Sequence, residues 1–410
     1  MAAKRREKTK TDEKTKEGSA ATVGSVPNPA ANPFAPTFGA PPPLFAGRDD
    51  ILRRFDSALD TGPTHPDYTL LITGERGTGK TALLNVLEAR CAERGWQSIT
   101  AAASTESLST RITNEAQRLL ADLAAESRRP RLSSISALGV GIKMVDEGHR
   151  DSAPAGASLL TTLERLAEAL QEIGTGLLIT VDELHDAERD DVRDVASAVQ
   201  IVTRRRQRPL AFAAAALAFI ENTHLADVNM TFLQRCARAR LDALDSADAR
   251  RAIRQPIQDS GSDIEGDALD EAVAATLGHP YMIQLVGFHA WETRMNAAAS
   301  VSVADVRAGI VEADHAMVGQ IAGPIWNRLS AMDRRFLVAM LDDGDDSSLS
   351  DIADRIGRDL QYTRVYRRRL LSAGAIDDRN GARVAYRHHA LRKRAQNAVL
   401  EDPNLSPRNR

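Results

Sequence analysis

The sequence predicts an α/β fold in which helices cover both faces of a parallel β-sheet, followed by an all-helical region and a small C-terminal module. Three observations lead to this prediction. Up to about Leu244, apolar runs typical of buried strands alternate with helical patterns, which is the order of a parallel sheet. The next stretch carries helical patterns alone. Near the C-terminus, three helical patterns precede a β-hairpin with Asn380-Gly381 at its turn.

The 410 residues are enough for two or three domains. Residues 1–44 join a lysine-rich start to a proline-rich stretch without apolar periodicity, so we expect an unstructured arm there. The other boundaries follow from changes of pattern. They give an α/β core (45–245), a helical region (246–325), a C-terminal module (326–398) and an unstructured tail (399–410).

The composition is that of a soluble globular protein, with 43% hydrophobic and 27% charged residues. The net charge of −3 creates no overall field that attracts nucleic acid, so any such binding must be local. Cys91 and Cys236 are too few for a disulfide framework or a zinc site. The most apolar run, 210–220, is shorter than the roughly 20 residues of a membrane helix, and no signal peptide is visible. We therefore expect a cytoplasmic protein without a membrane segment.

The elements of the core follow one another in a regular order. The first helix carries Ile51, Leu52, Phe55 and Leu59 at helical spacing. Residues 128–153 are irregular, with a short hairpin predicted over 137–145. The other predicted elements are strands ending at Gly74 and Asp182, strands over 96–104 and 209–217, and helices over 115–125, 159–173 and 190–205. In the helical region, helices are predicted over 246–255, 267–277, 280–295 and 303–321.

A glycine-rich loop separates the first strand from the helix that follows it. The loop fits G-x-x-x-x-G-K-[ST] in full, with the residues Gly74, Glu75, Arg76, Gly77, Thr78, Gly79, Lys80 and Thr81. Glycines allow successive backbone N–H groups to point inward and surround an anion, and the positive end of the following helix adds to that field. Lys80 is predicted to contact the β- and γ-phosphates of a nucleotide, and the Thr81 hydroxyl to bind Mg²⁺.

Two acids at the end of a later apolar strand complete the predicted site. In "LLITVDELH", Asp182 and Glu183 follow a run of buried-strand residues about 100 positions after the phosphate loop. Acids beside an apolar strand are costly unless they serve a ligand. Asp182 is predicted to hold Mg²⁺, directly or through water. Glu183 is predicted to orient and deprotonate the attacking water, which makes the chain an ATPase.

The chain from about Phe45 to Arg394 resembles the AAA+ and STAND-type ATPases related to origin-recognition proteins. The resemblance rests on "FAGRDD" before the phosphate loop, "VDELH" after the third strand and "LGHPYMIQLVGFHAW" in the helical region. It implies that Phe45, Gly47 and Arg48 lie near the adenine. It also implies that the helical region is a lid, whose His279 and Pro280 approach the nucleotide. Adenine is implied over guanine, and no N-K-x-D guanine signature is present.

The chain departs from the family pattern at two places. Residues 213–216 are alanines where many relatives carry a polar sensor, and no arginine stands beside Pro280 at the second sensor position. Both departures predict slow turnover. Arg235, Arg238 and Arg240 follow the fourth strand, where arginines of relatives sense the γ-phosphate or act across a subunit interface. It is equally compatible with the sequence that these are ordinary surface arginines at the end of a helix. The sequence also does not indicate which of the three arginines would have a functional role.

The C-terminal module is predicted to be a winged helix-turn-helix, with three helices before the hairpin. Its charge is uneven: residues 341–360 hold seven aspartates, whereas residues 361–394 hold nine arginines and one lysine. Arg364, Arg367 and Arg368 fall on one face of the third helix and are candidates for contacts with duplex DNA.

Two functions of different classes remain open. In the first, the chain is an ATP-dependent molecular switch that couples nucleotide state to a DNA-binding winged helix. In the second, it is a signalling or defence ATPase whose winged helix is an internal hinge that binds no nucleic acid. Self-assembly or a protein partner is compatible with both. ATP and Mg²⁺ are the expected ligands in either case.

Overall fold

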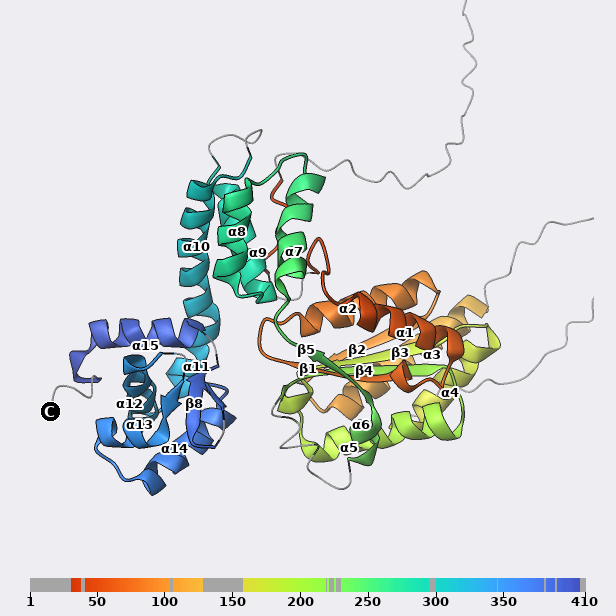
Figure 1. Cartoon of the computed structure of the whole chain (residues 1–410). Helices are drawn as coiled ribbons and strands as arrows, with labels where there is room; N and C mark the ends of the chain where they lie inside the picture. Colours follow the sequence, from red (N-terminus) through yellow and green to blue (C-terminus); the bar gives the residue numbers. More distant parts are fainter. Residues whose placement is uncertain are drawn as a thin grey trace, which may run out of the picture.

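The computed structural model describes residues 31–37, 41–103, 106–127, 158–218, 220, 225, 230–294, 300–344, 346–379, 381–387 and 389–405. They form an α/β core, a helical region beside it that we call the lid, and a C-terminal module, with the long helix α10 leading from the lid to the module (Figure 1). The hairpin predicted over 137–145 and the turn residue Asn380 lie outside the described residues.

The core is a five-stranded sheet with the order β2-β3-β4-β1-β5, and all of its pairings are parallel. The predicted α/β class is therefore confirmed. β1 is buried along its whole length, as expected for an inner strand covered on both faces. The strands are β1 (Thr69–Gly74), β2 (Gln97–Ala102), β3 (Leu177–Asp182), β4 (Leu210–Leu217) and β5 (Ala237–Leu241).

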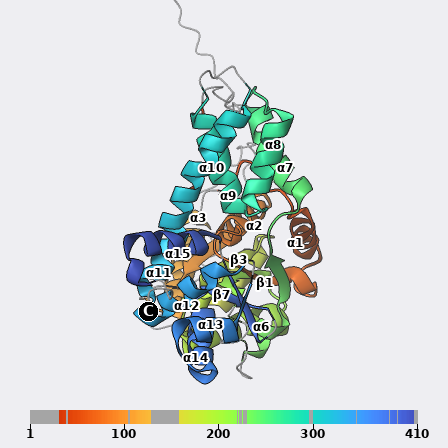
Figure 2. The same cartoon turned by 60° about the vertical axis from the view of Figure 1, so that its left-hand side comes forward.

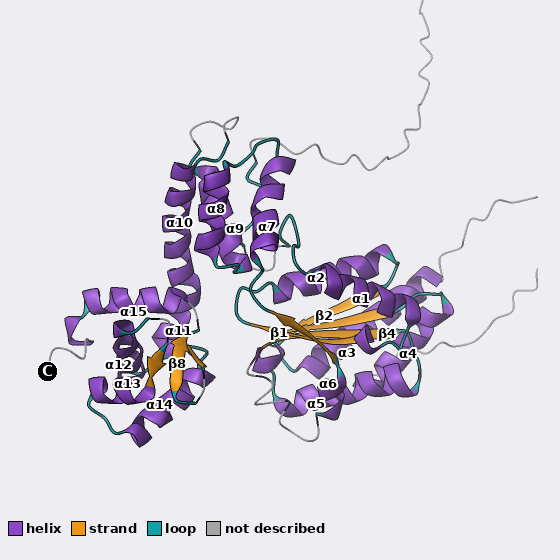
Figure 3. Cartoon of the chain, viewed as in Figure 1, coloured by secondary structure: helices purple, strands orange, loops and turns teal. Residues whose placement is uncertain are grey.

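Helices cover both faces of this sheet (Figure 3). Leu70 and Ile72 of β1 face one side, where they pack against α1 and α2, whereas Leu71 faces the opposite side, which α3, α4, α5 and α6 cover. The alternation follows from the two-residue period of a strand. The helices are α1 (Asp49–Thr61), α2 (Lys80–Glu93), α3 (Leu108–Ser127), α4 (Leu159–Glu172), α5 (Arg189–Gln200) and α6 (Thr231–Arg235).

The fifth strand, β5, was not predicted from the sequence. Its residues Ala-Arg-Ala-Arg-Leu alternate between small or apolar side chains that face the core and arginines that are exposed. Arg238 and Arg240 therefore lie on an edge strand beside β1, and the interpretation of these two as residues of a helix end is wrong. Arg235 does lie at the end of a helix, α6.

The lid consists of four helices, and a segment from the N-terminal region packs on it. Phe34 is buried in a notch at Gly287, where a Cβ atom would lie 2.5 Å from the Phe34 ring. The Asn32 side chain donates to the Phe288 carbonyl (3.0 Å). The expectation of an unstructured arm up to residue 44 is thus wrong for this part, because one aromatic side chain and backbone-directed hydrogen bonds hold it. The helices are α7 (Ser246–Asp259), α8 (Gly266–Thr276), α9 (Pro280–Glu292) and α10 (Val303–Met317).

The C-terminal module combines helices with a three-stranded sheet of order β6-β8-β7, antiparallel at both pairings. Its last helix runs to Glu401 and is followed by a helical turn, Pro403–Leu405, so the unstructured tail expected from 399 is wrong at its beginning. The elements are α11 (Gly323–Arg328), α12 (Ala331–Ala339), β6 (Ser347–Ser348), α13 (Leu349–Ile356), α14 (Leu360–Ser372), β7 (Ile376–Asp378), β8 (Arg383–Tyr386) and α15 (His389–Glu401).

The uneven charge of the module is largely paired inside it. Many of its arginines lie against aspartates of the same module, in the acidic half, in α12 and in the hairpin. The pairs are Arg355 with Asp343 (2.6 Å), Arg367 with Asp378 (2.6 Å), Arg383 with Asp346 (2.7 Å), Arg369 with Asp333 (3.0 Å) and Arg387 with Asp377 (2.7 Å). Charge asymmetry along the sequence is therefore no direct measure of a basic surface.

The lid and the C-terminal module share one continuous hydrophobic core. It includes Val286 of α9 and Val306 of α10 in the lid, and Phe336 of α12 and Leu391 of α15 in the module, all of them buried. Figure 2 shows α15 lying next to the lower end of α10. The α/β core has separate hydrophobic clusters on the two faces of its sheet. Within the described residues, no helix has both the length and the apolar character needed to cross a membrane.

Candidate nucleotide-binding and catalytic site

The phosphate loop joins β1 to α2 and has the backbone that its glycines predict. Gly77 and Gly79 have φ values of 78° and 92°, which side-chain-bearing residues rarely adopt. A Cβ atom at Gly74 would lie 2.7 Å from the Leu241 carbonyl oxygen, so this close approach to β5 also requires glycine. α2 begins at Lys80, which places the positive end of a helix at the loop.

Lys80 is buried in this loop, with 7% of its surface exposed. Its Nζ donates to the carbonyl oxygens of Glu75 (2.7 Å) and Gly74 (3.3 Å). Burial lowers the pKa of Lys80 to about 8, an effect partly offset by the carboxylates of Glu183 and Asp182. A buried ammonium that contacts backbone oxygens and faces acids fits a site for an anionic phosphate group.

The second predicted half of the site meets the first at the carboxyl ends of β1 and β3. Thr81 Oγ1 donates to Asp182 Oδ2 at 2.6 Å. An alcohol and a carboxylate oxygen at this separation suit Mg²⁺, which prefers hard oxygen ligands. Burial, followed by the neighbouring Asp182 carboxylate, raises the pKa of Glu183, which moves this carboxyl toward the range useful for a general base.

The lid reaches the phosphate loop directly. The Tyr281 N–H donates to the Gly77 carbonyl (3.2 Å), and His279 Nε2 lies 3.1 Å from the Arg76 carbonyl oxygen. A Cβ atom on Gly77 would lie 2.6 Å from His279 Cε1, so a side chain there would push the lid away. Pro280 opens α9, and the His279 side chain accepts from a backbone N–H of its first turn.

A pocket of about 180 Å³ lies between the loop, the lid and the N-terminal segment. Most of the predicted nucleotide contacts line it. They are Phe45, Arg48, Arg76, Gly77, Thr78, Gly79, Lys80, Thr81 and Pro280, and the predicted general base Glu183 lines the pocket as well.

Four predicted contacts do not line this pocket: Gly47, Gly74, Glu75 and His279. The position of Gly47 requires glycine for structural reasons. Its φ is 70°, and a Cβ atom there would lie 2.7 Å from Asp248 Oδ2. Gly47 therefore lets the chain pass close to α7 on the way to the pocket.

Glu75 faces the C-terminal module instead. Its Oε1 lies 3.8 Å from Nε of Arg387, which also pairs with Asp377. Burial and then the Asp377 carboxylate raise the pKa of Glu75 to about 7. Arg387 thus brings the C-terminal module to the phosphate loop, and its separation of 312 positions from Glu75 hid it from sequence reasoning.

The side of the pocket formed by the N-terminal segment and the lid contains residues that sequence reasoning missed. Ala35 and Pro42 of the N-terminal segment line it, together with Gln284 and Gln320. The Ala35 N–H donates to Gln284 Oε1 (3.2 Å), and the Tyr281 hydroxyl donates to Gln320. A signal was available in "NPFAPTFGAPPPLF", where aromatic residues interrupt an otherwise small and proline-rich stretch.

The three arginines after β4 differ in their surroundings. Arg240 pairs with Asp242 (2.9 Å), and its side chain is 76% exposed. None of Arg235, Arg238 and Arg240 lines the nucleotide pocket. A role across an interface between copies of the chain remains a prediction.

A family model described as the AAA ATPase domain matches residues 44–213. Another, described as a domain of unknown function (DUF8462), matches residues 320–392. No curated protein matches the chain in sequence.

Solved structures resemble nearly the whole chain. A Walker-type ATPase of Pyrococcus abyssi superposes with a TM-score of 0.60 at 13% identity, covering 86% of this chain and 96% of that chain. The ORC2 protein of Aeropyrum pernix, in ADPNP–ADP complexes, gives a TM-score of 0.58 at 16% identity, covering 90% and 98%. Its ADP form gives 0.50 at 16% identity, covering 89% and 97%. Residues 44–213, which carry the phosphate loop and the acids at the end of β3, thus match the AAA ATPase domain family, and the chain shares its overall fold with the Walker-type ATPase and the ORC2 protein.

Proposed function

We propose that the chain is a slowly hydrolysing ATP switch, in which the nucleotide state of the phosphate loop sets the position of the lid and of the C-terminal module. The observation that carries the proposal is the direct contact of the lid with the loop, through Tyr281 on Gly77 and His279 on Arg76. A nucleotide whose phosphates bind the N–H groups of the loop would act on the same backbone segment whose carbonyl oxygens the lid contacts, and we propose that it changes these contacts.

The residues of the site have separate roles in this proposal. Lys80 and the loop N–H groups bind the phosphates, while Thr81 and Asp182 hold Mg²⁺. Bound Mg²⁺ would neutralise phosphate charge and fix the phosphate oxygens. Glu183 takes the proton from the attacking water. Slow turnover is expected because β4 offers only alanines over 213–216, so this strand has no polar side chain there to contact the γ-phosphate.

The shared hydrophobic core couples the position of the C-terminal module to that of the lid. Since the lid and the C-terminal module are packed as one unit, a rotation of the lid carries the module with it. The proposal therefore predicts that nucleotide changes the distance between the α/β core and the module, but not the distance between the lid and the module.

Distances between spin labels test this prediction. Cys91 and Cys236 are buried, so labels can be placed at introduced cysteines. Ile173→Cys in the core and Leu400→Cys in the module are suitable because these side chains are 64% and 82% exposed. We expect the distance in this pair to differ between ADP and a non-hydrolysable ATP analogue. The pair Val311→Cys and Leu400→Cys, within the lid and module, is the control and should stay constant. Tight nucleotide binding with no change in the first pair would contradict the switch.

Duplex DNA is a second candidate ligand, supported by two exposed arginines. Arg364 and Arg368 are exposed on α14, four residues apart and hence on one side of the helix. Arg367, by contrast, pairs with Asp378 at 2.6 Å, and its side chain is 16% exposed. We propose that Arg364 and Arg368 contact DNA phosphates, and that Arg367 holds the third helix of a winged helix to its hairpin.

The salt dependence of DNA binding separates these roles. Replacing both Arg364 and Arg368 by Ala should reduce the slope of log K against log salt by about two, one per lost phosphate contact. Arg367→Ala is the matched control and should lower the thermal midpoint while changing the slope little. Titration of wild type with duplex DNA at two salt concentrations provides the reference. If the wild-type protein does not bind duplex DNA at low salt, the DNA-binding proposal is excluded. The alternative, in which the winged helix is an internal hinge of the switch, then remains.

A further inference from the structure

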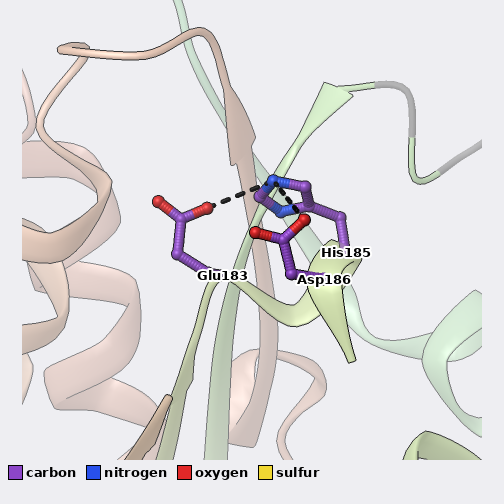
Figure 4. A group of neighbouring side chains, drawn as sticks. All are labelled: Glu183, His185 and Asp186. Carbon is purple, nitrogen blue, oxygen red and sulfur yellow. Dashed lines mark ion pairs between the residues drawn. The ribbon is translucent and has the colours of Figure 1, made fainter. Parts of the chain in front are cut away.

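The carboxylate of Glu183 lies against the imidazole of His185 (Figure 4). His185 Nε2 is 3.2 Å from Glu183 Oε2 and 3.8 Å from Asp186 Oδ1. The His185 side chain is only 1% exposed, whereas Glu183 is 38% and Asp186 is 64% exposed. The buried imidazole of His185 thus packs against the partly exposed carboxylate of Glu183 at the end of β3.

A backbone group fixes the state of the ring. The N–H of Leu217, at the end of β4, donates to His185 Nδ1 (3.2 Å). Because a backbone N–H can only donate, Nδ1 is the accepting nitrogen, and the proton of the neutral ring is on Nε2, which faces Glu183. Burial lowers the pKa of His185, which favours this neutral ring at physiological pH.

The backbone of Glu183 also has an uncommon conformation. Its φ and ψ are 50° and 38°, the left-handed region, which costs a non-glycine residue about 1 kcal/mol or more. Surrounding contacts must hold such a residue in place. The Glu183 N–H donates to Asp182 Oδ1 (2.8 Å), and His185 meets the other end of the residue, at its carboxylate.

We infer that His185 is a positioning residue for ATP hydrolysis. Its Nε2 lies 3.2 Å from Glu183 Oε2 without forming an aligned hydrogen bond in this structure, and we assign its Nε2–H as the donor that holds Oε2 during hydrolysis and leaves Oε1 to accept a proton from the attacking water. The inference rests on the proposed function, in which Glu183 is the general base. The proton passes from water to Glu183 as the water oxygen bonds to the γ-phosphorus and the bond to the leaving ADP oxygen breaks. His185 neither gains nor loses a proton. It ties the base to the end of β4, a strand whose own side chains there are alanines.

Two substitutions separate the two hydrogen-bonding functions of the ring. His185→Asn places an oxygen near the position of Nδ1 and can still accept from Leu217, but it is too short to reach Glu183. His185→Gln places an amide nitrogen near the position of Nε2 and can still donate to Glu183. We expect His185→Asn to lower kcat about tenfold with unchanged KM and ATP affinity, and His185→Gln to keep most of the wild-type kcat. Glu188→Gln, at an exposed residue nearby, should leave kcat unchanged.

The measurements are steady-state ATP hydrolysis, ATP calorimetry and thermal unfolding of each variant. Wild-type kcat in a folded His185→Asn variant would overturn the inference, as would parallel losses in kcat and ATP affinity. If His185→Asn does not fold, a folded His185→Gln variant with strongly reduced kcat overturns it instead. Glu183→Gln, measured in the same experiment, distinguishes a failure of the His185 inference from a failure of the proposal that Glu183 is the general base. If that variant hydrolyses ATP at the wild-type rate, the general base is misassigned, whatever His185 does.

Discussion

Lys80→Ala should abolish measurable ATP binding. The substitution removes the buried ammonium that faces the phosphate site, and charge-assisted hydrogen bonds to phosphate oxygens are lost with it. From about 1.5–3 kcal/mol for each such bond, two lost bonds weaken binding by roughly 100-fold or more. Calorimetry with ATP and Mg²⁺ measures this directly.

Thermal unfolding of the same variant provides the control. The wild-type protein should gain about 2.7 kcal/mol in its free energy of unfolding when ATP is present at 100 times its Kd. Lys80→Ala should gain nothing from ATP. Without ATP it should be at least as stable as wild type, because burial already disfavours the charge of Lys80. Undiminished affinity in the variant would show that the loop does not bind the phosphates.

Glu183→Gln should bind ATP and fail to hydrolyse it. The amide keeps the size and polarity of the carboxylate but cannot accept the proton of the attacking water. The expected loss in kcat is about 10²- to 10⁴-fold, with ATP affinity close to that of wild type. Phosphate release under saturating ATP and calorimetry on the same preparation give both quantities.

Glu188→Gln is the matched control for this prediction. Glu188 is an exposed glutamate five residues further along the chain, just before α5, and loses the same charge. Its kcat should equal that of wild type. If Glu183→Gln and Glu188→Gln hydrolyse ATP at the same rate, general-base catalysis by Glu183 is excluded.

The phosphate loop could be predicted from the sequence because its chemistry is local. Its eight consecutive residues supply the backbone freedom, the cation and the hydroxyl, so the motif alone specified what the structure places between β1 and α2. The position of Asp182 beside the phosphate loop could also be predicted, because the strands of one parallel sheet end at the same edge. Its hydrogen bond with Thr81 shows that the two residues predicted to hold Mg²⁺ lie side by side.

The remaining parts of the site depend on long-range packing. Arg387 approaches the phosphate loop only because the C-terminal module folds back beside the core, and no spacing in the sequence encodes that approach. Phe34 was hidden for a different reason. Proline-rich composition is typical of unstructured chains, and one aromatic residue in a glycine-made notch outweighs that tendency. β5 was missed because arginines at alternate positions disguise a short edge strand.

The contact between Glu75 and Arg387 has a thermodynamic consequence for any molecule that binds the C-terminal module. If ATP alters this contact, then a partner that draws Arg387 away from the loop must alter ATP affinity by the same factor by which ATP alters the affinity for that partner. A partner could therefore be found by its effect on nucleotide binding, before its own binding surface is known. Conversely, a molecule that occupies the module without changing ATP affinity does not read the state of the switch, however tightly it binds.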